Sequence, residues 1–560
     1  MNLRTLYCAA LLCVLGLAAC QINDGSAPGL AATEIPHLRK QGTATQLIVD
    51  GKPFLALAGE LGNNTATSLE YMKHVWPKLL DTHLNTALAA VSWAQIEPLE
   101  GKYDFSVLDG VIRGARENKL HLMLLWFGSW KNGESTYAPD WVKKDFARFP
   151  REQRPAGTSV EVLTPFSEAN RDADARAFAA LMRHVKEFDG RGHTVIMIQV
   201  ENEINGRDRS ALAAKALAGQ VPSQLIDYLQ RHKETLIPEL KKVWETAGFK
   251  TFGTWAEVFG TSGAADEIFT AWHYASYTGR IAAAGKAEYP IPMYVNSWGN
   301  SFPRGNGSAN GAPMSDVFDV WRAGAPDVDM ISPDIYDADY AQMLALYTRS
   351  GNPLFIPETR GFPPNNLAVR VLYAFGRHDA IGFSPMGIER PAVPDIELTS
   401  AYDVIKQLAP LISAHQGDGT MSAVLIGAND PVQKVKVGDY TLECSYLMPR
   451  TQPPAPQPQP PFPNAAAIFI QAGPDEFYGA GTGVNVKFTP NTPGPPLASL
   501  ATVEEGEFVN GRWVRMRYLA GDDTGSRMLV LPRIHDTPAN PALFGPSFKG
   551  VVRVTLYRFQ

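Results

Sequence analysis

The sequence predicts an α/β protein with a (β/α)8 TIM barrel followed by a C-terminal antiparallel β-sandwich-like domain. Short apolar runs alternate with amphipathic helical segments from residue 54 to about residue 415, as in a parallel sheet covered by helices. Beyond residue 415, strand-like runs follow one another without helices, as in a sandwich. The chain has 560 residues, more than one hydrophobic core usually holds, so two folded regions are expected.

The barrel strands are predicted from apolar runs, because a parallel sheet is buried on both faces. The candidate strands span residues 54–61, 84–93, 120–127, 195–200, 250–255, 292–298, 328–336, 353–358 and 380–386. A closed barrel of this type has eight strands, so one candidate is surplus. We remove residues 250–255, which are short and interrupted by Gly253. An open doubly wound sheet would alternate in the same way, but no glycine-rich nucleotide turn follows the first strand.

Apolar residues at helical spacing mark helices between these strands. Residues 69–80, 107–115 and 178–185 each carry one apolar helical face, the pattern of helices that cover a sheet. Gly190 is a suitable C-terminal stop for the third of them. Residues 225–243 form a longer helical segment that Pro238 is expected to kink or divide.

The C-terminal region is predicted to be β-structure throughout. Its candidate strands span residues 422–426, 432–437, 440–447, 467–471, 483–488, 513–518, 528–532 and 551–559. Residues 479–483 are expected to form a glycine-rich turn, and the proline-rich residues 453–463 a stiff extended loop. We therefore assign residues 35–415 to the barrel and residues 416–560 to an accessory β-domain.

The N-terminus has the features of an export signal. Arg4 precedes an apolar stretch at residues 6–17 that is too short to span a bilayer as a mature helix. The ending Leu17-Ala18-Ala19-Cys20 is similar to a bacterial lipobox, which implies that residues 1–20 are a lipoprotein signal with Cys20 as the lipidated residue. The alternative is an ordinary cleaved signal with an incidental cysteine. Residues 21–34 would tether the domain to the membrane, and Gln21, in place of Asp, favours sorting to the outer membrane.

Composition and motifs exclude several other functions. The net charge is −6 without a basic run, which argues against a nucleic-acid partner. With the signal removed and Cys20 lipidated, Cys444 alone remains, so no intramolecular disulfide is expected. The sequence has no His-Glu-x-x-His or zinc-type cysteine pair, no Gly-x-Ser-x-Gly elbow and no phosphate loop. We therefore expect no metal and no cofactor. No feature indicates an oligomeric state.

Two glutamates each follow a buried strand. Glu203 lies just beyond residues 195–200, on the predicted fourth strand, and Glu358 ends residues 353–358, on the predicted seventh. The carboxyl ends of parallel barrel strands open onto one mouth. Two carboxylates about 5 Å apart at that mouth are what a retaining glycosidase requires. The alternative for either residue is a solvated loop glutamate or a charge at a helix N-terminus.

Several motifs resemble those of β-galactosidases in glycoside hydrolase families 35 and 42. The segment at 93–105, Trp-Ala-Gln-Ile-Glu-Pro-Leu-Glu-Gly-Lys-Tyr-Asp-Phe, is similar to their early signature, and the Pro-Asp-Trp-Val segment at 139–142 to a later element. The Gln-Val-Glu-Asn-Glu run at 199–203 matches a family 35 motif, which implies that Glu203 is the acid/base. The third strand departs from the family pattern, since it ends in Trp-Phe-Gly-Ser-Trp at 126–130 rather than in Asn-x-Glu.

Five further residues are candidate sugar contacts. Asn202 is expected to bind the sugar 2-hydroxyl or to cap a turn, and Glu60 to hold sugar hydroxyls or form a salt bridge. Trp126, Trp298 and Tyr336 end strands and are expected to stack on the sugar, to orient Glu358 or to serve packing alone. Glu97 and Glu100 are expected to hold their own loop.

Together these observations predict a membrane-anchored, exo-acting retaining β-galactosidase, with Glu358 as the nucleophile and oligosaccharides as substrates. The preference for galactose, and for xyloglucan side chains as its source, comes from the resemblance alone. The alternatives are another retaining β-glycosidase of clan A and a non-catalytic carbohydrate-binding surface lipoprotein.

Overall fold

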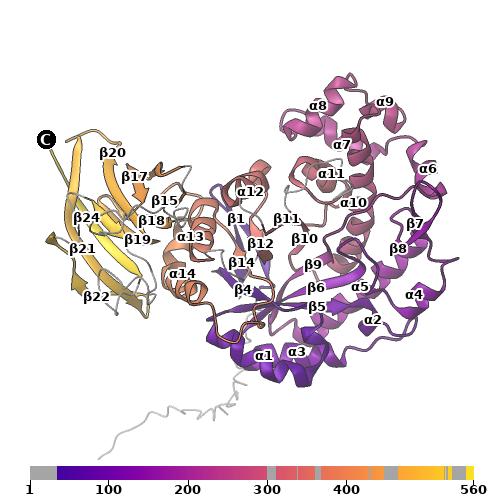
Figure 1. Cartoon of the computed structure of the whole chain (residues 1–560), viewed down its shortest axis with the longest axis horizontal. Helices are drawn as coiled ribbons and strands as arrows, with labels where there is room; N and C mark the ends of the chain where they lie inside the picture. Colours follow the sequence, from indigo (N-terminus) through magenta and orange to yellow (C-terminus); the bar gives the residue numbers. More distant parts are fainter. Residues whose placement is uncertain are drawn as a thin grey trace, which may run out of the picture. The chain divides into compact units, whose positions relative to one another are not determined.

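The computed structural model describes residues 34–298, 311–336, 339–359, 367–427, 430–446, 465–521, 524, 528–531 and 550–560 (Figure 1). These residues belong to one compact unit, Glu34–Gln560. The predicted signal, Cys20, most of the predicted tether and the proline-rich segment 453–463 lie outside the described residues. Within the described part, no helix combines the length and apolar character needed to cross a membrane.

A parallel sheet forms the predicted barrel. Its order is β12-β14-β4-β5-β6-β9-β10-β11-β13. The bounds are β4 Ala56–Glu60, β5 Thr86–Ser92, β6 His121–Lys131, β9 Val195–Asn202, β10 Met293–Trp298, β11 Met330–Ile335, β12 Phe355–Ile356, β13 Glu358–Thr359 and β14 Gly382–Phe383. The segments β12 and β13, at the two ends of this order, are halves of the predicted seventh strand, so the sheet closes on itself. The TIM barrel prediction is confirmed.

The seventh strand is divided at Pro357. Phe355 and Ile356 pair with β14, whereas Glu358 and Thr359 pair with β11. Proline has no backbone N–H and cannot donate to a ladder, so the two pairings meet at the residue that lacks a donor. Consequently Glu358 is held by β11, where it lies opposite Asp334.

Helices surround the barrel strands. The α-helices are α1 Leu69–Asp81, α2 Trp93–Ile96, α3 Ser106–Glu117, α4 Asp140–Lys144, α5 Glu168–Asp189, α6 Ala211–Leu217, α7 Ser223–Arg231, α8 Pro238–Thr246, α9 Trp255–Phe259, α10 Gly263–Glu288, α11 Phe318–Gly324, α12 Tyr340–Tyr347, α13 Leu367–His378 and α14 Ile396–His415. Short 3-10 helices η1 Thr65–Thr67, η2 Ser315–Val317 and η3 Arg349–Gly351 complete the set. Pro238 divides the predicted long helix by starting α8, and residues 250–254 form no strand, as expected.

Alternate residues of each barrel strand face opposite sides, as strand geometry requires. Leu122 and Leu124 of β6 belong to the core shared with the helices, whereas Met123 and Leu125 belong to a core inside the barrel. The inner core also contains Leu47 of β2. The sheet β1 His37–Gln41, β2 Ala44–Val49 and β3 Lys52–Phe54, which the sequence did not predict, therefore packs against the barrel interior.

The C-terminal region forms two antiparallel sheets, with orders β15-β18-β19-β24-β21-β22 and β16-β17-β20-β23. Their bounds are β15 Met421–Ile426, β16 Val432–Val437, β17 Tyr440–Tyr446, β18 Ala465–Gly473, β19 Glu476–Thr482, β20 Val484–Pro490, β21 Leu497–Val509, β22 Arg512–Tyr518, β23 Leu529–Leu531 and β24 Val551–Phe559. Phe469 of one sheet and Leu442 of the other share a hydrophobic core. The predicted antiparallel sandwich is confirmed.

One local prediction in this region is wrong. Residues 479–482 belong to β19 and not to a turn. The Cβ that a larger residue would add at Gly481 would lie 2.8 Å from Ala467 Cβ, so glycine permits close approach of β18. The turn itself is confined to Gly483, which has a φ of 75°.

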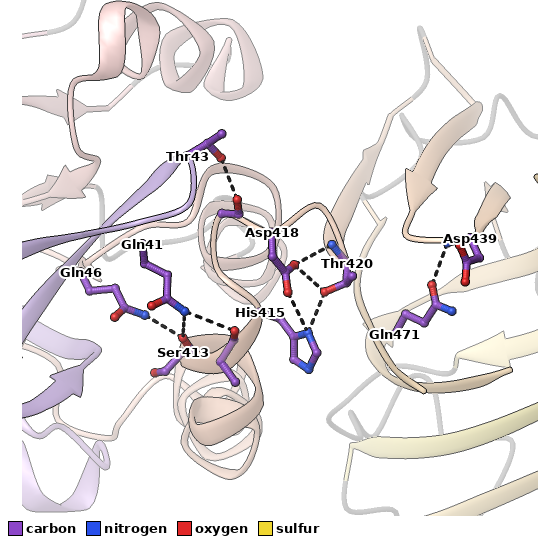
Figure 2. A network of polar contacts seen from close by, with 11 residues as sticks. Gln41, Thr43, Gln46, Ser413, His415, Asp418, Thr420, Asp439 and Gln471 are labelled. Atoms are coloured by element: carbon purple, nitrogen blue, oxygen red, sulfur yellow. Dashed lines mark hydrogen bonds and ion pairs between the residues drawn. The ribbon is translucent and has the colours of Figure 1, made fainter. Parts of the chain in front are cut away.

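The β-region packs against the last barrel helices. The Cβ of a larger residue at Gly376 of α13 would lie 2.7 Å from Ile468 of β18, so the two elements are in close contact. Figure 2 shows polar contacts around the chain segment between α14 and β15. Gln46 Nε2 donates to the Ser413 carbonyl at 2.7 Å, and His415 Nδ1 lies 2.6 Å from Thr420 Oγ1. These contacts hold the connection, which runs from His415 to Met421 across the predicted boundary at 415/416.

Candidate active site

Three buried carboxylates meet at the carboxyl ends of the barrel strands. Glu203 directly follows β9, Asp334 lies on β11 and Glu358 opens β13. One oxygen of each lies within 4.8 Å of the corresponding oxygen of the other two. All three residues are at most 3% exposed. The structure thus brings Glu203 and Glu358 together, and it adds Asp334, which the sequence analysis did not single out.

Glu358 is held by three hydrogen-bond donors. Its Oε1 accepts from Asn202 Nδ2 at 3.1 Å and from Asn296 Nδ2 at 3.2 Å, and its Oε2 accepts from Tyr336 Oη at 2.6 Å. Both oxygens therefore act as acceptors, which is the role of an ionised carboxylate. Asn202 and Tyr336 were predicted near this site, and each orients Glu358.

Glu203 has a different environment. Burial, followed by the negative charge of Glu358, raises the pKa of Glu203 to about 8. Its Oε1 has no hydrogen-bond partner among the described residues. The residue has a φ of 44°, and its backbone N–H donates to Asn296 Oδ1 at 3.0 Å. Glu203 is thus a carboxyl group that retains its proton at neutral pH.

Asn296 connects all three carboxylate-bearing segments. It accepts from the Glu203 N–H, and its Nδ2 lies 2.8 Å from Asp334 Oδ2 as well as within reach of Glu358. Burial, followed by the charges of Glu358 and Glu203, raises the pKa of Asp334 well above its ordinary value. Both residues lie inside predicted strands, and polar residues near the end of a buried strand are the signal that would have identified them.

Lys131 supplies a positive charge that the sequence analysis missed. The predicted third strand ended at residue 127, but β6 continues to Lys131 through an irregular segment opposite β9. Lys131 is 7% exposed, and its Nζ donates to Asn202 Oδ1 at 2.7 Å. The same Nζ lies 5.1 Å from the ring centroid of Phe127, a cation–π distance. Asn202 therefore connects Lys131 to Glu358 and does not cap a turn.

Glu60 ends β4 and is completely buried. Neither carboxylate oxygen has a hydrogen-bond partner among the described residues, so the structure shows no salt bridge of the kind considered above. Burial, followed by the charge of Glu358, raises the pKa of Glu60 well above its ordinary value, and the charge of Lys131 opposes that rise. Glu60 thus shares the electrostatic environment of the cluster.

Trp126 has the packing role that was considered for it as the alternative to a sugar contact. The ring is fully buried, and its Nε1 donates to Asp174 Oδ1 of α5 at 2.8 Å. Glu201, from the same motif as Glu203, also lies outside the cluster, since it accepts from the backbone N–H groups of Ser129 and Trp130. By strand alternation Glu201 and Glu203 would share a face, but both have positive φ, 61° and 44°, which re-aims the side chains. Trp126 is a structural residue.

Trp298 lies beside Glu203. It ends β10, and a hydrogen bond between its side chain and Glu203 partly opposes the rise in the pKa of Glu203, which is caused first by burial. It is partly exposed. Of the predicted aromatic contacts, Tyr336 and Trp298 thus touch the two glutamates.

The motif at residues 93–105 makes contacts that stabilise its own loop. Glu97 accepts from Trp93 Nε1 at 2.8 Å and from the Gly101 N–H at 2.7 Å, so it holds its own loop. Trp141, of the second motif, donates its Nε1 to the Glu97 carbonyl at 3.1 Å. Glu100 forms an ion pair with Arg148. The two segments that carried the resemblance therefore pack together.

Among the described residues, Glu203, Asp334 and Glu358 also have the spacing of metal ligands. Both oxygens of Glu358 are, however, already acceptors from two amides and a hydroxyl. A cation bound there would face donor protons, which repel it. The donor set therefore fits carboxylate chemistry better than a metal centre.

Two family models match the chain. Residues 72–270 match the glycoside hydrolase family 42 model, described as β-galactosidase. Residues 398–530 match a domain of unknown function, DUF5597. Residues 72–270 are therefore similar to a glycoside hydrolase domain of the family 42 type. The clan A barrel predicted from the motifs is compatible with this match, whereas the placement in family 35 is not supported by it. Glu203 lies within the matched range and Glu358 beyond it.

Named relatives are distant. Beta-galactosidase 14 of Arabidopsis thaliana is 28% identical over 219 residues, which are 37% of this chain and 22% of that protein. The solved β-galactosidase of Rahnella sp. R3 has a TM-score of 0.43 and 16% identity, over 65% of this chain and 57% of that one. The β-galactosidase of Bacillus circulans sp. alkalophilus has a TM-score of 0.43 and 16% identity, over 63% of this chain and 56% of that one. The chain thus spans about a fifth of the curated relative's length.

Proposed function

We propose that the protein is an exo-acting retaining β-galactosidase that releases terminal β-linked galactose from oligosaccharides. The observation that carries this proposal is the pair Glu203 and Glu358, whose nearest carboxylate oxygens lie within 4.8 Å. Double displacement requires carboxyl groups about 5–5.5 Å apart, whereas inversion requires about 6.5–9.5 Å to admit a water between them. The shorter spacing supports retention.

In the first step, Glu358 attacks the anomeric carbon and Glu203 donates its proton to the leaving oxygen. A bond forms between a Glu358 oxygen and the sugar, and the glycosidic bond breaks. The hydrogen bonds from Asn202, Asn296 and Tyr336 fix the direction of the nucleophile. Asn202 uses one N–H for Glu358, which leaves its second N–H for the sugar 2-hydroxyl.

In the second step, Glu203 becomes the base. Once Glu358 is esterified it carries no charge, and the second cause of the raised pKa of Glu203 disappears, although burial, the first cause, remains. The pKa of Glu203 then falls, so the group can accept a proton from the attacking water. Water displaces Glu358, and galactose leaves with its original anomeric configuration.

The choice of galactose is supported by the description of the matching family model and by the names of the relatives. Within that choice, galactose-terminated side chains of xyloglucan are the preferred substrate. Lipidation at Cys20 would place the enzyme in the cell envelope, most simply on the outer membrane. The other candidates are a different retaining β-glycosidase and a carbohydrate-binding protein without activity.

A panel of nitrophenyl β-glycosides tests the proposal. We expect the galactoside to be hydrolysed faster than the glucoside, xyloside or mannoside, with the β-anomer of the sugar appearing first in proton NMR spectra. Glu358→Gln should lower kcat by more than about a hundredfold, whereas Glu443→Gln, a partly exposed control on β17 that pairs with Lys434, should not. Hydrolysis of none of the glycosides would favour the binding protein, and a preference for another sugar would favour the other glycosidase.

A further inference from the structure

A polar groove lies at the segments that follow β4 and β14. It has a volume of about 710 Å³ and is lined by the segment that follows β4, by α1 and its N-cap from Ser68 to Lys78, and by the segment that follows β14. Asn63, Asn64 and Tyr71 contribute to one side and Arg390 to another. Both segments follow carboxyl ends of barrel strands, the end of the barrel at which Glu203 and Glu358 also lie.

The walls of the groove are fixed by a buried carboxylate. Glu389, which is 6% exposed, accepts at Oε1 from the Gly62 N–H at 2.9 Å and from Thr65 Oγ1 at 2.7 Å. Lys78 of α1 donates its Nζ to the Glu389 carbonyl at 2.7 Å. These bonds join the segment after β4 to the segment after β14. These hydrogen bonds therefore hold the walls of the groove in place.

A continuous set of contacts leads from the groove to the nucleophile. Tyr137 donates its hydroxyl to Asn64 Oδ1 at 3.2 Å, and its ring packs edge-on against Phe127 at 5.0 Å. The Nζ of Lys131 lies 5.1 Å from the centroid of the Phe127 ring and donates to Asn202 Oδ1. Asn202 in turn donates to Glu358. These contacts connect Asn64, which lines the groove, to Glu358.

We infer that this groove binds the sugar rings of the substrate that lie beyond the terminal galactose. The inference rests on the proposed function and names the part of the substrate that this function leaves open. A volume of about 710 Å³ falls within the range of about 300–1,000 Å³ typical of sites for small organic ligands, so it holds more than one hydroxyl group.

The lining has the chemistry of a carbohydrate site. Asn63, Asn64 and Arg390 offer hydrogen-bond donors and acceptors, and Asn63 Oδ1 is buried without a partner among the described residues. Tyr71 is 56% exposed, so its ring is available for stacking against the apolar face of a sugar. Amides and a hydroxyl-bearing ring suit a neutral, hydroxyl-rich chain. The enzyme should therefore favour galactosides whose leaving group is an oligosaccharide.

Two substrates and one pair of variants test this inference. The substrates are nitrophenyl β-galactoside, which is too short to fill the groove, and a galactose-terminated xyloglucan oligosaccharide. For Tyr71→Ala in the full chain we expect KM for the oligosaccharide to rise about fivefold or more, with kcat/KM for the nitrophenyl galactoside within twofold of the wild type. Tyr71→Phe, which keeps the ring, should restore the KM. Tyr557→Ala, with a similarly exposed ring on β24, should change neither.

A binding measurement separates failure of this inference from failure of the proposed function. If the wild type hydrolyses neither substrate, the proposed function is wrong, and calorimetric titration with the oligosaccharide still tests the groove. Weaker binding to Tyr71→Ala than to Tyr71→Phe supports the inference. Equal affinity of the two variants, an unchanged KM for the oligosaccharide, or an equal loss on both substrates would overturn it.

Discussion

Asp334 and Glu358 lie directly opposite each other on the neighbouring parallel strands β11 and β13. Both are buried, and Asn296 donates to both. Two carboxylates so close in a site of low polarity cannot both ionise without a large cost. All three donors at Glu358 favour its role as an acceptor, and burial, followed by the charge of Glu358, raises the pKa of Asp334 well above its ordinary value. We therefore expect Asp334 to be the group that carries a proton.

Replacement of Asp334 tests this assignment. Asn is the isostere of a protonated Asp, so Asp334→Asn should keep kcat/KM within about tenfold of the wild type and leave the alkaline limb of the pH profile in place. Asp334→Ala removes the hydrogen bond to Asn296 and should cost more, about 1–3 kcal/mol of transition-state stabilisation. The measurement is kcat/KM against pH for both variants. An equal loss in the two variants would show that the charge of Asp334 is required.

The raised pKa of Glu203 predicts the alkaline limit of activity. The pKa is raised to about 8, first by burial and then by the charge of Glu358. The general acid loses its proton above this pH, so kcat/KM should fall tenfold per pH unit well above pH 8. Carbon NMR of the Glu203 carboxyl in Glu358→Gln should show a lower pKa than in the wild type, because the negative charge is absent. A pKa that does not move would contradict the electrostatic coupling.

The raised pKa of Glu203 also makes the stability of the fold depend on pH. The folded-state pKa of Glu203 exceeds the ordinary value of 4.5, so its contribution to stability is fully present below pH 4.5 and is lost as pH rises through 8. Glu203→Gln cannot ionise and should escape this loss. Its Tm relative to the wild type should therefore rise by a few degrees between about pH 5 and pH 8. Thermal unfolding followed by circular dichroism at both pH values measures the difference.

The charge of Lys131 lowers the pKa of Glu203, whereas the charge of Glu358 raises it, after the larger effect of burial. Lys131→Met keeps most of the side-chain length without the charge, so the alkaline limb should move to higher pH while kcat/KM falls about tenfold or more. The control is Lys434→Met, at an exposed lysine of β16. A limb that moves to lower pH would show that Lys131 acts by another route.

Trp126 should matter for stability and not for substrate binding. Trp126→Phe leaves Asp174 Oδ1 without its indole donor at a fully buried position, which should cost about 1–3 kcal/mol in the free energy of unfolding. Urea unfolding measures that cost. KM for the nitrophenyl galactoside should stay within twofold of the wild type, and a larger change would restore a role for Trp126 at the sugar.

The sequence revealed the barrel because each strand is buried on both faces and so appears as an apolar run. It revealed Glu203 and Glu358 because they interrupt such runs at the end where the barrel opens. Lys131 could not be found in this way, since an irregular extension of β6 carries it to the cluster. Gly128 permits that path: a Cβ at this position would lie 2.4 Å from Trp126 Nε1 and 2.7 Å from Glu201 Oε1.

The sequence analysis also did not predict elements that lack a clear hydrophobic periodicity. The helix α10 is buried on most of its surface, with Phe269, Trp272 and Tyr274 among its buried residues, so no single apolar face marked it. The strand β19 was hidden by glycines that favour close packing but also occur in turns. The β1–β3 sheet contributes to the barrel interior through contacts with residues far along the chain, such as Phe355, and no local pattern reports such contacts.

The seventh barrel strand is divided into two short segments, β12 and β13, which pair with different neighbours. The segment β12 contributes two residue pairs with β14, and β13 two with β11, whereas β5 and β6 share seven. Pairings of two residues also join β9 to β10 and β4 to β14. Because a short pairing opens more readily, the amide hydrogens of Ile356 and Thr359 should exchange with deuterium sooner than that of Leu124. Because Glu358, the proposed nucleophile, lies in one of these short pairings, substitutions that aim at heat resistance should begin beside Pro357.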